Sequence, residues 1–555
     1  MRLTTLFFTA TLIFSDFSFA LVDMNNACYS NNWIDLEVPG SGYAMRVLRA
    51  YKSRSLYNGI FGFGWCSEYE TRLNQTPEGG VKVSECGDGE EIFYSAREVS
   101  KADKESVIKR IFENMKATGK NPGFSADYMA HLKKQLMRDQ TARENYAAQY
   151  KVTIQVNVGA VLMANGREIE NVVLQKNFYT RNLSDGTSQR FDLEGRLVSV
   201  YNKNGDVLNI NYEKERIVSL ENSKAVKLSF QYFPNGKVQK VTGPGGLKSE
   251  YRYSENDDLI WNKPAIAKSD TEVNTYEYNE YHNMTKAVYP DKTFTSMKYD
   301  NQKDWVTSFT DREKCVETYK YESSATQPEL NYWALTTKVC DGITVASNRY
   351  EFWHKQLPAG QTVLSRIQTN INGSVKDVIY DDVLGKPLSI KTDTETAEYK
   401  YLPNGLLKSK LTPQKTLEFS YDSKTQKISK VVEKVFDGKR IPQIRSSSFK
   451  YDSKGNLIFA ENSAGKSVKL THDMMGRIIT LVDGKNPAVT LKYEEKFGKP
   501  SEIVRQDFGS VKITYNAKGE IANVTSSKGP LAAEMIAGSY NTLMGILAPV
   551  EQNIY

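Results

Sequence analysis

Four histidines, His131, His282, His354 and His472, are the residues best suited to acid–base catalysis or metal binding near neutral pH, and they are scattered along the chain. The sequence has no H-E-x-x-H, no G-x-S-x-G and no phosphate-binding glycine loop. Carboxylates are frequent at predicted turns, so residue types alone leave open a pair of the kind that glycosidases use. The sequence thus predicts no catalytic residue, no cofactor and no metal ion.

Five cysteines offer the other chemistry, disulfide formation. Cys66 and Cys86 flank a Pro-Glu-Gly-Gly turn, and Cys315 and Cys340 bracket a second predicted strand-turn-strand unit. Adjacent strands bring Cα atoms to the separation that a disulfide needs. We therefore expect these two pairs, with Cys28 left over; partly buried free thiols are the alternative. A zinc site is disfavoured because no C-x-x-C occurs.

Disulfides imply export, and the N-terminus has the required pattern. Residues 1–20 contain one arginine, an apolar run and small residues at positions 18 and 20, which predicts a signal peptide cleaved after Ala20. The run is too short for a membrane span. We expect a protein of the periplasm, the cell surface or the extracellular space. The net charge of +7 is spread along the chain, which disfavours nucleic-acid binding.

The elements that position these residues follow from a repeat. From about residue 178 an aromatic–acidic pair recurs, followed by a glycine turn and an aliphatic strand, and most neighbouring copies start 20 to 22 residues apart. Examples are Tyr299 with Asp300, Tyr380 with Asp381, Tyr421 with Asp422, and Tyr451 with Asp452 and Gly455.

Each repeat predicts a β-hairpin, because its strands alternate apolar and polar residues and its turns carry glycine. The repeat tyrosine can pack its ring on the neighbouring hairpin while its hydroxyl reaches water or a backbone group. A single hairpin is unstable alone, so successive hairpins must stack. The predicted fold is mainly β: repeated antiparallel β-hairpins that wind into a spiral shell or barrel, with a small helical hairpin insert.

These motifs resemble the YD-repeat family, also called RHS repeats. The segment 50–66, which contains Gly62, Phe63, Gly64 and Trp65, is similar to the segment that opens the array in that family. The resemblance implies a hollow shell, which in several members encloses a C-terminal toxic domain. This chain lacks the core-terminating Asp-Pro-x-Gly element, and about 29 residues follow its last repeat. It therefore looks like a member without a C-terminal toxin domain.

The chain divides into five predicted parts. After the signal peptide come an N-terminal β region (21–96), a helical hairpin insert (97–150), the repeat array (151–526) and an apolar tail (527–555). The tail is interpreted as a plug inside the shell or as a partner-binding helix. The insert is interpreted as a cover for a sheet edge or as a basic docking element.

The combined features predict an exported, non-catalytic shell or scaffold that encapsulates or binds a ligand at a bacterial envelope or outside the cell. A separate protein cargo and an envelope glycan are the candidate partners. One alternative is a carbohydrate-binding surface adhesin that uses exposed tyrosine rings. The other is a glycan-active enzyme on a β-propeller, since two hairpins would make one blade.

Overall fold

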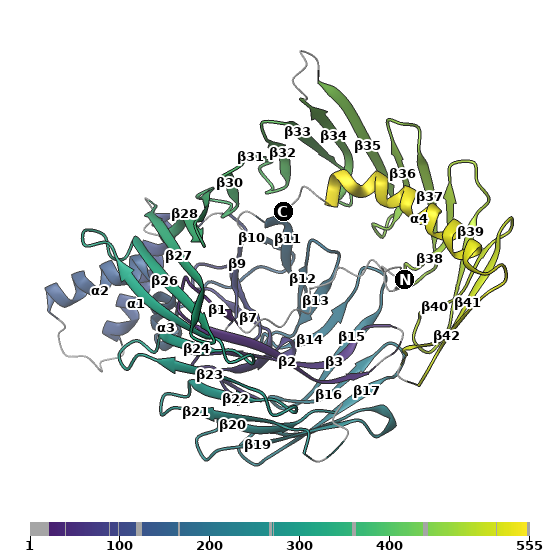
Figure 1. Cartoon of the computed structure of the whole chain (residues 1–555). Coiled ribbons are helices and arrows are strands. Elements are labelled where there is room, and N and C mark those ends of the chain that lie inside the picture. The colour runs from purple at the N-terminus through teal and green to yellow at the C-terminus, as the bar shows by residue number, and fades with distance from the viewer. Residues whose placement is uncertain are drawn as a thin grey trace.

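The computed structural model describes residues 21–551, apart from residues 39, 41, 88, 98, 118–124, 165–166, 266–268, 270, 358–361, 437–441 and 518. In this part of the chain 36 strands form one antiparallel sheet, paired in chain order from β7 to β42. The predicted β-hairpin shell is confirmed. The propeller alternative is wrong, because the strands form one continuous curved sheet and not separate blades (Figure 1).

The first half of the sheet comprises β7 (Arg72–Gln75), β8 (Val81–Ser84), β9 (Glu91–Ser95), β10 (Val161–Ala164), β11 (Arg167–Leu174), β12 (Tyr179–Asn182), β13 (Ser188–Phe191), β14 (Leu197–Tyr201), β15 (Val207–Glu213), β16 (Arg216–Asn222), β17 (Lys227–Tyr232), β18 (Val238–Thr242), β19 (Lys248–Tyr253), β20 (Leu259–Lys263), β21 (Asn274–Tyr278), β22 (Met284–Val288), β23 (Phe294–Tyr299), β24 (Val306–Thr310) and β25 (Val316–Ser323).

The second half comprises β26 (Asn331–Cys340), β27 (Ile343–Gln356), β28 (Thr362–Ile371), β29 (Ser374–Tyr380), β30 (Pro387–Thr392), β31 (Thr396–Tyr401), β32 (Leu407–Leu411), β33 (Lys415–Tyr421), β34 (Ile428–Val435), β35 (Gln443–Tyr451), β36 (Leu457–Asn462), β37 (Ser467–His472), β38 (Ile478–Asp483), β39 (Val489–Tyr493), β40 (Pro500–Arg505), β41 (Gly509–Tyr515) and β42 (Ile521–Ser526).

In most repeat units the hydroxyl of the repeat tyrosine ties the hairpin to the one before it. In β17, for example, Tyr232 donates to the backbone carbonyl of Ile217 in β16, at 2.6 Å. Ten further tyrosines make the same bond in the described part of the chain, at 2.7 to 3.0 Å: Tyr212, Tyr253, Tyr278, Tyr299, Tyr321, Tyr401, Tyr421, Tyr451, Tyr493 and Tyr515. We call this bond the tyrosine staple.

The other motif residues complete the unit. At one turn, Asp452 accepts the backbone N–H groups of Lys454 at 2.9 Å and Asn456 at 2.8 Å, while Gly455 adopts φ of 76°. Where an arginine follows the turn glycine, it covers the next tyrosine: the guanidinium of Arg196 lies 5.2 Å from the ring centre of Tyr212. Acidic, glycine, basic and aromatic positions therefore each have a local structural role.

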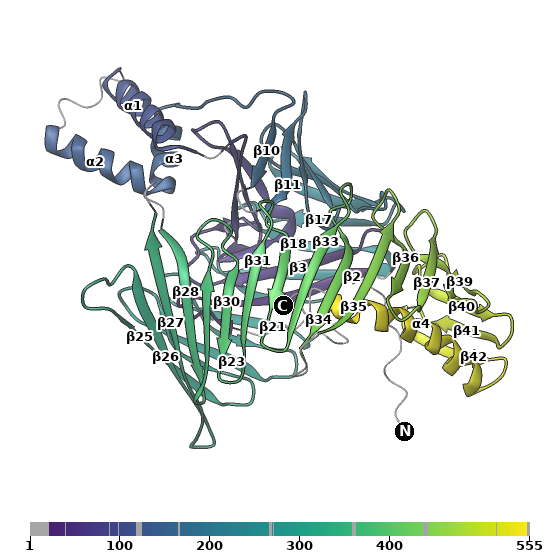
Figure 2. The same ribbon diagram turned by 90° about the horizontal axis from the view of Figure 1, so that it is seen from above.

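The sheet closes on itself near its start. Residue Arg72 at the beginning of β7 bridges to Arg196, which immediately precedes β14. The backbone N–H of Leu73 donates to the carbonyl of Gly195 at 2.9 Å. The strands after β14 continue as a curved sheet (Figures 1 and 2).

A separate four-stranded sheet fills the concave side of this first half. It has the order β1 (Leu21–Val22), β2 (Tyr29–Val38), β3 (Met45–Lys52) and β6 (Trp65–Ser67). Trp33 and Trp65 lie 5.6 Å and 5.2 Å from the ring of Tyr276 in β21, and Tyr29 stacks on Phe309 in β24 at 5.9 Å. A core of buried residues from both sheets results.

Helix α4 (Pro530–Glu551) packs on the other end of the large sheet. It packs against strands β34–β38 and β41–β42 (Figure 2). Its residues Leu543 and Ile546 join a second core with Leu470, Leu481 and Val489 of the sheet. The predicted tail thus forms a helix that packs on the sheet, and residues 552–555 lie outside the described part.

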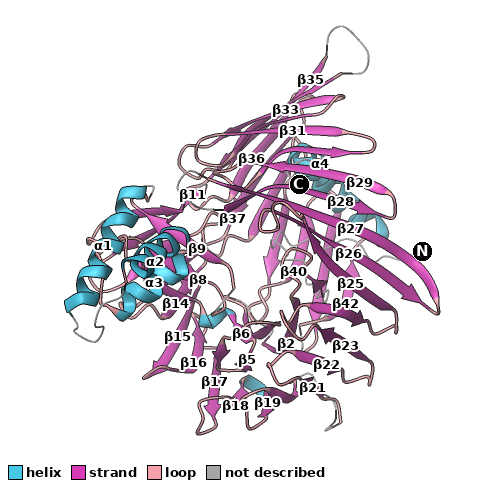
Figure 3. Cartoon of the chain, turned by 90° about the vertical axis from the view of Figure 1, so that its left-hand side faces the viewer, coloured by secondary structure: helices cyan, strands magenta, loops and turns pink. Residues whose placement is uncertain are grey.

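The insert forms three helices and not the predicted hairpin of two. They are α1 (Lys101–Ala117), α2 (Ala126–Arg138) and α3 (Gln140–Gln149), and they share a small core of their own. Figure 3 shows them projecting from one side of the sheet. The extra break occurs at Asp139, whose carboxylate accepts the N–H of Ala142 and caps α3. A buried ion pair of Arg143 with Glu78 anchors the bundle.

Two disulfides join Cys66 to Cys86 and Cys315 to Cys340, the pairs that the spacing favoured. The second pair connects the segment before β25 to the end of the adjacent β26. Cys28 is a buried free thiol, and burial raises its pKa. The predicted signal peptide, residues 1–20, lies outside the described residues and remains a prediction.

The tyrosine staple leads to a first prediction. We expect Tyr232→Phe to lower the free energy of unfolding by about 0.5–1.5 kcal/mol, because one backbone-directed hydrogen bond is lost. His472 occupies a repeat tyrosine position, and its buried Nδ1 has no partner in the described part. His472→Tyr should therefore gain a similar amount.

Urea unfolding measures both changes. The control is Tyr281→Phe, since Tyr281 is 52% exposed and makes no staple in the described part of the chain. Equal losses for Tyr232→Phe and Tyr281→Phe would contradict the assigned role of the staple.

Candidate functional site: the concave face of the sheet

The N-terminal sheet contains a buried ion pair that contacts the concave face of the large sheet. The side chains of Asp35 in β2 and Arg49 in β3 are 1% and 0% exposed. Arg49 donates to both carboxylate oxygens, through Nη2 at 2.8 Å and also through Nε. Burial alone would lower the pKa of Arg49, but the carboxylate of Asp35 raises it, and the net shift is upward.

Groups of the large sheet complete the environment of this pair. Tyr251 donates its hydroxyl proton to Asp35 at 2.8 Å, and Ser249 donates to the Asp35 carbonyl at 2.7 Å. The guanidinium of Arg49 lies 4.3 Å from the ring centre of Trp65. The pair therefore joins two sheets and has no access to solvent, which makes it a structural element.

The opening segment lies beside this ion pair. Trp65 is fully buried and donates its indole N–H to the hydroxyl of Tyr278 at 2.9 Å. Phe63 stacks on His282, with ring centres 3.8 Å apart. Gly62 has φ of 96°, and a Cβ there would lie 2.3 Å from the carbonyl oxygen of Asp257. This segment packs the N-terminal sheet against the array.

The part of the large sheet between the two cores belongs to neither of them. No residue from 322 to 406 belongs to the first or the second core in the described part of the chain. Tyr350 lies opposite Ala334, which lies opposite Tyr321 of the first core, so these side chains share the inner face. We call this face the open wall; it includes Tyr332, Thr336, Tyr350, Phe352, Thr369 and Val378.

The open wall combines aromatic rings with unsatisfied polar atoms. Tyr332 stacks on Phe352 and on His354, each at 5.4 Å between ring centres. The hydroxyl of Thr336 and Nδ1 of His354 are buried and have no hydrogen-bond partner among the described residues. Burial lowers the pKa of His354, which favours its neutral form. A buried polar group without a partner is costly, and in the described chain such atoms also occur beside the first core, for example Nε1 of Trp33 and Nη1 of Arg49.

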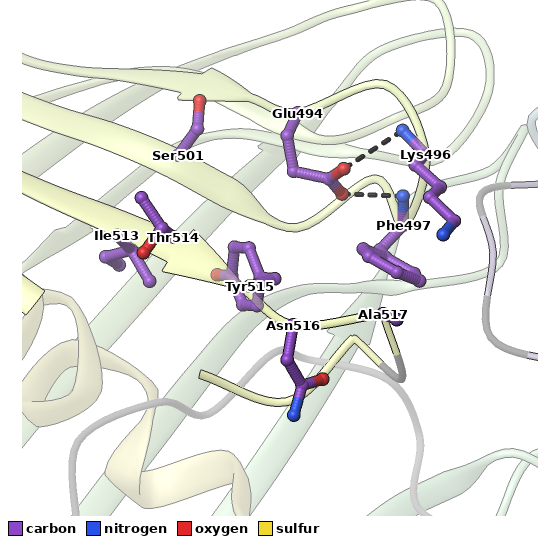
Figure 4. A pocket seen from close by; sticks show the side chains of 9 residues that line it. All are labelled: Glu494, Lys496, Phe497, Ser501, Ile513, Thr514, Tyr515, Asn516 and Ala517. Carbon is purple, nitrogen blue, oxygen red and sulfur yellow. Dashed lines mark hydrogen bonds between the residues drawn. The ribbon is translucent and has the colours of Figure 1, made fainter. Parts of the chain in front are cut away.

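Two small cavities lie elsewhere. Figure 4 shows one of about 470 Å³ at the turns after β39 and β41, lined by Phe497, Tyr515 and seven other residues. Its carboxylate, Glu494, accepts the backbone N–H groups of Lys496 at 3.0 Å and Phe497 at 2.6 Å. Turn hydrogen bonds therefore occupy the carboxylate of Glu494.

The second cavity, of about 270 Å³, contains Glu70 and Lys237. Burial raises the pKa of Glu70 and lowers the pKa of Lys237, a combination that is common in active sites. Here Glu70 accepts the hydroxyl of Tyr57 at 2.9 Å and the N–H of Ile60 at 2.8 Å, and Lys237 donates to the carbonyl of Gly59 at 2.9 Å. Both groups hold the 57–60 loop against the array.

The predicted repeat residues lie at strand ends and in the turns that follow. Tyr299, Tyr380, Tyr421 and Tyr451 each end a strand, and Asp300, Asp381, Asp422 and Asp452 begin the next turn. Hydrogen bonds from the Thr425 backbone and hydroxyl lower the pKa of Asp422. The structure distributes these residues along the rim of the sheet and does not bring them together in one site.

Of the histidines, His282 lies 2.8 Å from Asp258, His354 belongs to the open wall and His472 replaces a tyrosine. His131 is exposed on α2. Among the described residues no three His, Cys, Asp or Glu side chains form a cluster that could hold a metal ion. None of the helices in the described part of the chain combines the length and apolar character that a bilayer crossing requires.

Sequence reasoning missed the Asp35–Arg49 pair and the open wall. The pair is separated by 14 residues in two strands whose register is not evident from composition. The only available signal for the wall was the weak repeat pattern between 323 and 375, where β26, β27 and β28 are longer than most other strands.

Residues 21–94 match a family described as a domain of unknown function (DUF6531). No curated protein matches the chain. Similar solved structures include TcdB2-TccC3-TEV (11% identity, TM-score 0.42, 91% of this chain and 28% of that one) and a mutant Tc holotoxin pore of Photorhabdus luminescens (10% identity, TM-score 0.39, 90% and 29%). The chain therefore spans less than a third of the length of these structures.

The buried ion pair gives a second prediction. Arg49→Met should lower the free energy of unfolding by about 3–5 kcal/mol, because it leaves Asp35 charged and buried without its partner. Adding Asp35→Leu should recover part of the loss. Urea unfolding followed by the fluorescence of Trp33 and Trp65 reports on this core.

The matched control is the exposed pair of Lys286 and Glu277, whose side chains are 37% and 63% exposed. Lys286→Met should cost less than about 1 kcal/mol. If Arg49→Met cost no more than this control, the ion pair would not hold the two sheets together.

Proposed function

We propose that this chain is an exported, non-catalytic YD-repeat shell or scaffold whose open wall binds a polypeptide ligand. The observation that carries the proposal is the division of the concave face. The N-terminal sheet covers its first half and α4 covers its last strands, whereas the open wall between them belongs to neither core. The resemblance of the repeats to the YD-repeat family supports the shell.

A polypeptide is favoured over a glycan by the state of the repeat tyrosines. A sugar-binding platform needs a free ring face, but several repeat rings are covered by a basic side chain, as Tyr493 is by Arg477 at 4.5 Å. Their hydroxyls are also engaged in staples. The open wall instead offers aromatic rings and unpaired polar atoms, which suit apolar side chains and backbone groups of a peptide.

The non-catalytic part of the proposal rests on the cavities. Each acidic or basic group with an unusual pKa in the second cavity is hydrogen-bonded to the loop that it positions. Export is supported by the two disulfides and by the signal-peptide pattern.

A photo-cross-linking amino acid placed at residue 350 tests the binding surface in the exported chain. We expect one discrete adduct with a polypeptide from the native host. The same amino acid at residue 320, an exposed position on the opposite face of β25, should give none. Equal adduct formation at both positions would contradict the proposal.

Thr336→Val separates binding from folding. This change removes a buried hydroxyl that has no partner in the described structure, so the free energy of unfolding should stay the same or rise slightly. The cross-link from residue 350 should nevertheless become weaker. An unchanged cross-link would show that the Thr336 hydroxyl takes no part in binding.

N-terminal sequencing of the exported protein tests the predicted cleavage of the signal peptide. We expect the mature chain to begin at Leu21, because the small residues Ser18 and Ala20 precede the cleavage point. A chain that still begins at Met1 outside the cytoplasm would contradict cleavage.

A further inference from the structure

The last strand of the sheet ends the array with an incomplete unit. Strand β42 pairs with β41, and no other strand in the described part of the chain pairs with its outer edge. Ile521 and Val524 of β42 lie opposite Tyr515 and Ile513 of the inner face, yet each is 50% exposed. At the same place in earlier hairpins the aliphatic residue is buried in the first half of the array, as Ile217 is at 3%, and partly buried in the second half, as Ile478 is.

The exposure has an identifiable cause, the missing next strand. In earlier hairpins the carbonyl of this aliphatic position accepts the staple of the following tyrosine, as Ile478 does from Tyr493 at 2.7 Å and Pro500 from Tyr515 at 2.8 Å. Ile521 is the next position in this series, and among the described residues no hydroxyl donates to its carbonyl. Both the apolar contact and the acceptor of a staple are therefore available at β42.

The edge lacks charge and proline, two of the usual protections, and its bulge at Ala522 resembles the bulge of β40, which still pairs with a following strand. Exposed edge strands of natural proteins carry charges, prolines or bulges that prevent another strand from pairing. The sequence of β42, Ile-Ala-Asn-Val-Thr-Ser, contains no charged residue and no proline. A strand that adds here would meet no opposing charge within β42.

We propose that the outer edge of β42 binds an extended strand of another polypeptide chain, one that carries a tyrosine at its end and continues the array as the next repeat unit. The added strand would supply backbone hydrogen bonds to β42, an apolar side chain over Val524, and a tyrosine hydroxyl to the Ile521 carbonyl.

A second copy of this chain fits less well. Two β42 edges paired with each other would bring no tyrosine to the Ile521 carbonyl, because β42 contains none. The strand at the opposite end of the sheet, β7, is already engaged by the bridge between Arg72 and Arg196. The occupant is therefore a tyrosine-bearing strand supplied by a different chain.

The probe is a fluorescein-labelled peptide with the sequence of residues 488–494, Ala-Val-Thr-Leu-Lys-Tyr-Glu, which includes a strand of the array and its staple tyrosine. Fluorescence anisotropy with the full exported chain should show saturable binding. A peptide with phenylalanine in place of the tyrosine should bind about five-fold more weakly, because it cannot form the staple. Hydrogen exchange of residues 521–526 should slow when the tyrosine peptide binds.

Val524→Lys should weaken peptide binding about ten-fold or more, because it places a charge on the apolar contact. The control is Ile444→Lys in β35, whose side chain is 62% exposed in a strand with partners on both sides, and this variant should bind normally. Circular dichroism checks that both variants fold.

Several results would overturn the inference. Absence of saturable binding to the folded wild-type chain would do so, as would equal affinity for the tyrosine and phenylalanine peptides. A wild-type chain that dimerises in light scattering, with the dimer lost in Val524→Lys, would assign the edge to a second copy instead.

Discussion

The hydrogen bond from a repeat tyrosine to the carbonyl of the preceding hairpin, made by eleven tyrosines of the described chain, is the interaction on which the architecture depends. A β-hairpin alone buries too little apolar surface to be stable in water. The staple holds Tyr232 at the backbone of Ile217, so that Ile217 is buried and Tyr232 is partly buried. Repetition of this contact gives a sheet in which every hairpin stabilises the next, and it sets a spacing of about 21 residues.

A curved sheet must also cover its concave face, and the chain does so in two different ways. At the first end a separate small sheet enters the curve, and its buried pair of Asp35 and Arg49 makes further hydrogen bonds with the large sheet, such as the one that Tyr251 donates to Asp35. At the second end a single helix supplies Leu543 and Ile546. The first solution includes polar contacts between the two sheets, such as those of Asp35 with Tyr251 and Ser249, whereas the second relies mainly on apolar contact.

The consequences for function follow from where charge and polarity lie. Acidic motif residues are used in turns, and basic ones cover tyrosine rings, so most of the charged residues in the repeats serve the fold. In the open wall, the Thr336 hydroxyl and His354 Nδ1 are buried and have no hydrogen-bond partner in the described structure. At the edge of β42, the side chain of Ile521 is exposed. The open wall and the edge of β42 are therefore the two surfaces that we propose for binding another molecule.

The sequence alone determined the hairpin repeat, the two disulfide pairs and the helical character of residues 101–149, because each depends on residues close in the chain. Tyrosine spacing, turn glycines and alternating polarity are local signals that translate directly into strands. Tertiary structure alone decided which element fills the curve, that Tyr251 of the large sheet meets Asp35, and that residues 322–406 of the described chain belong to neither core. These features depend on the curvature summed over many hairpins, and a small change in each hairpin alters which distant residues meet.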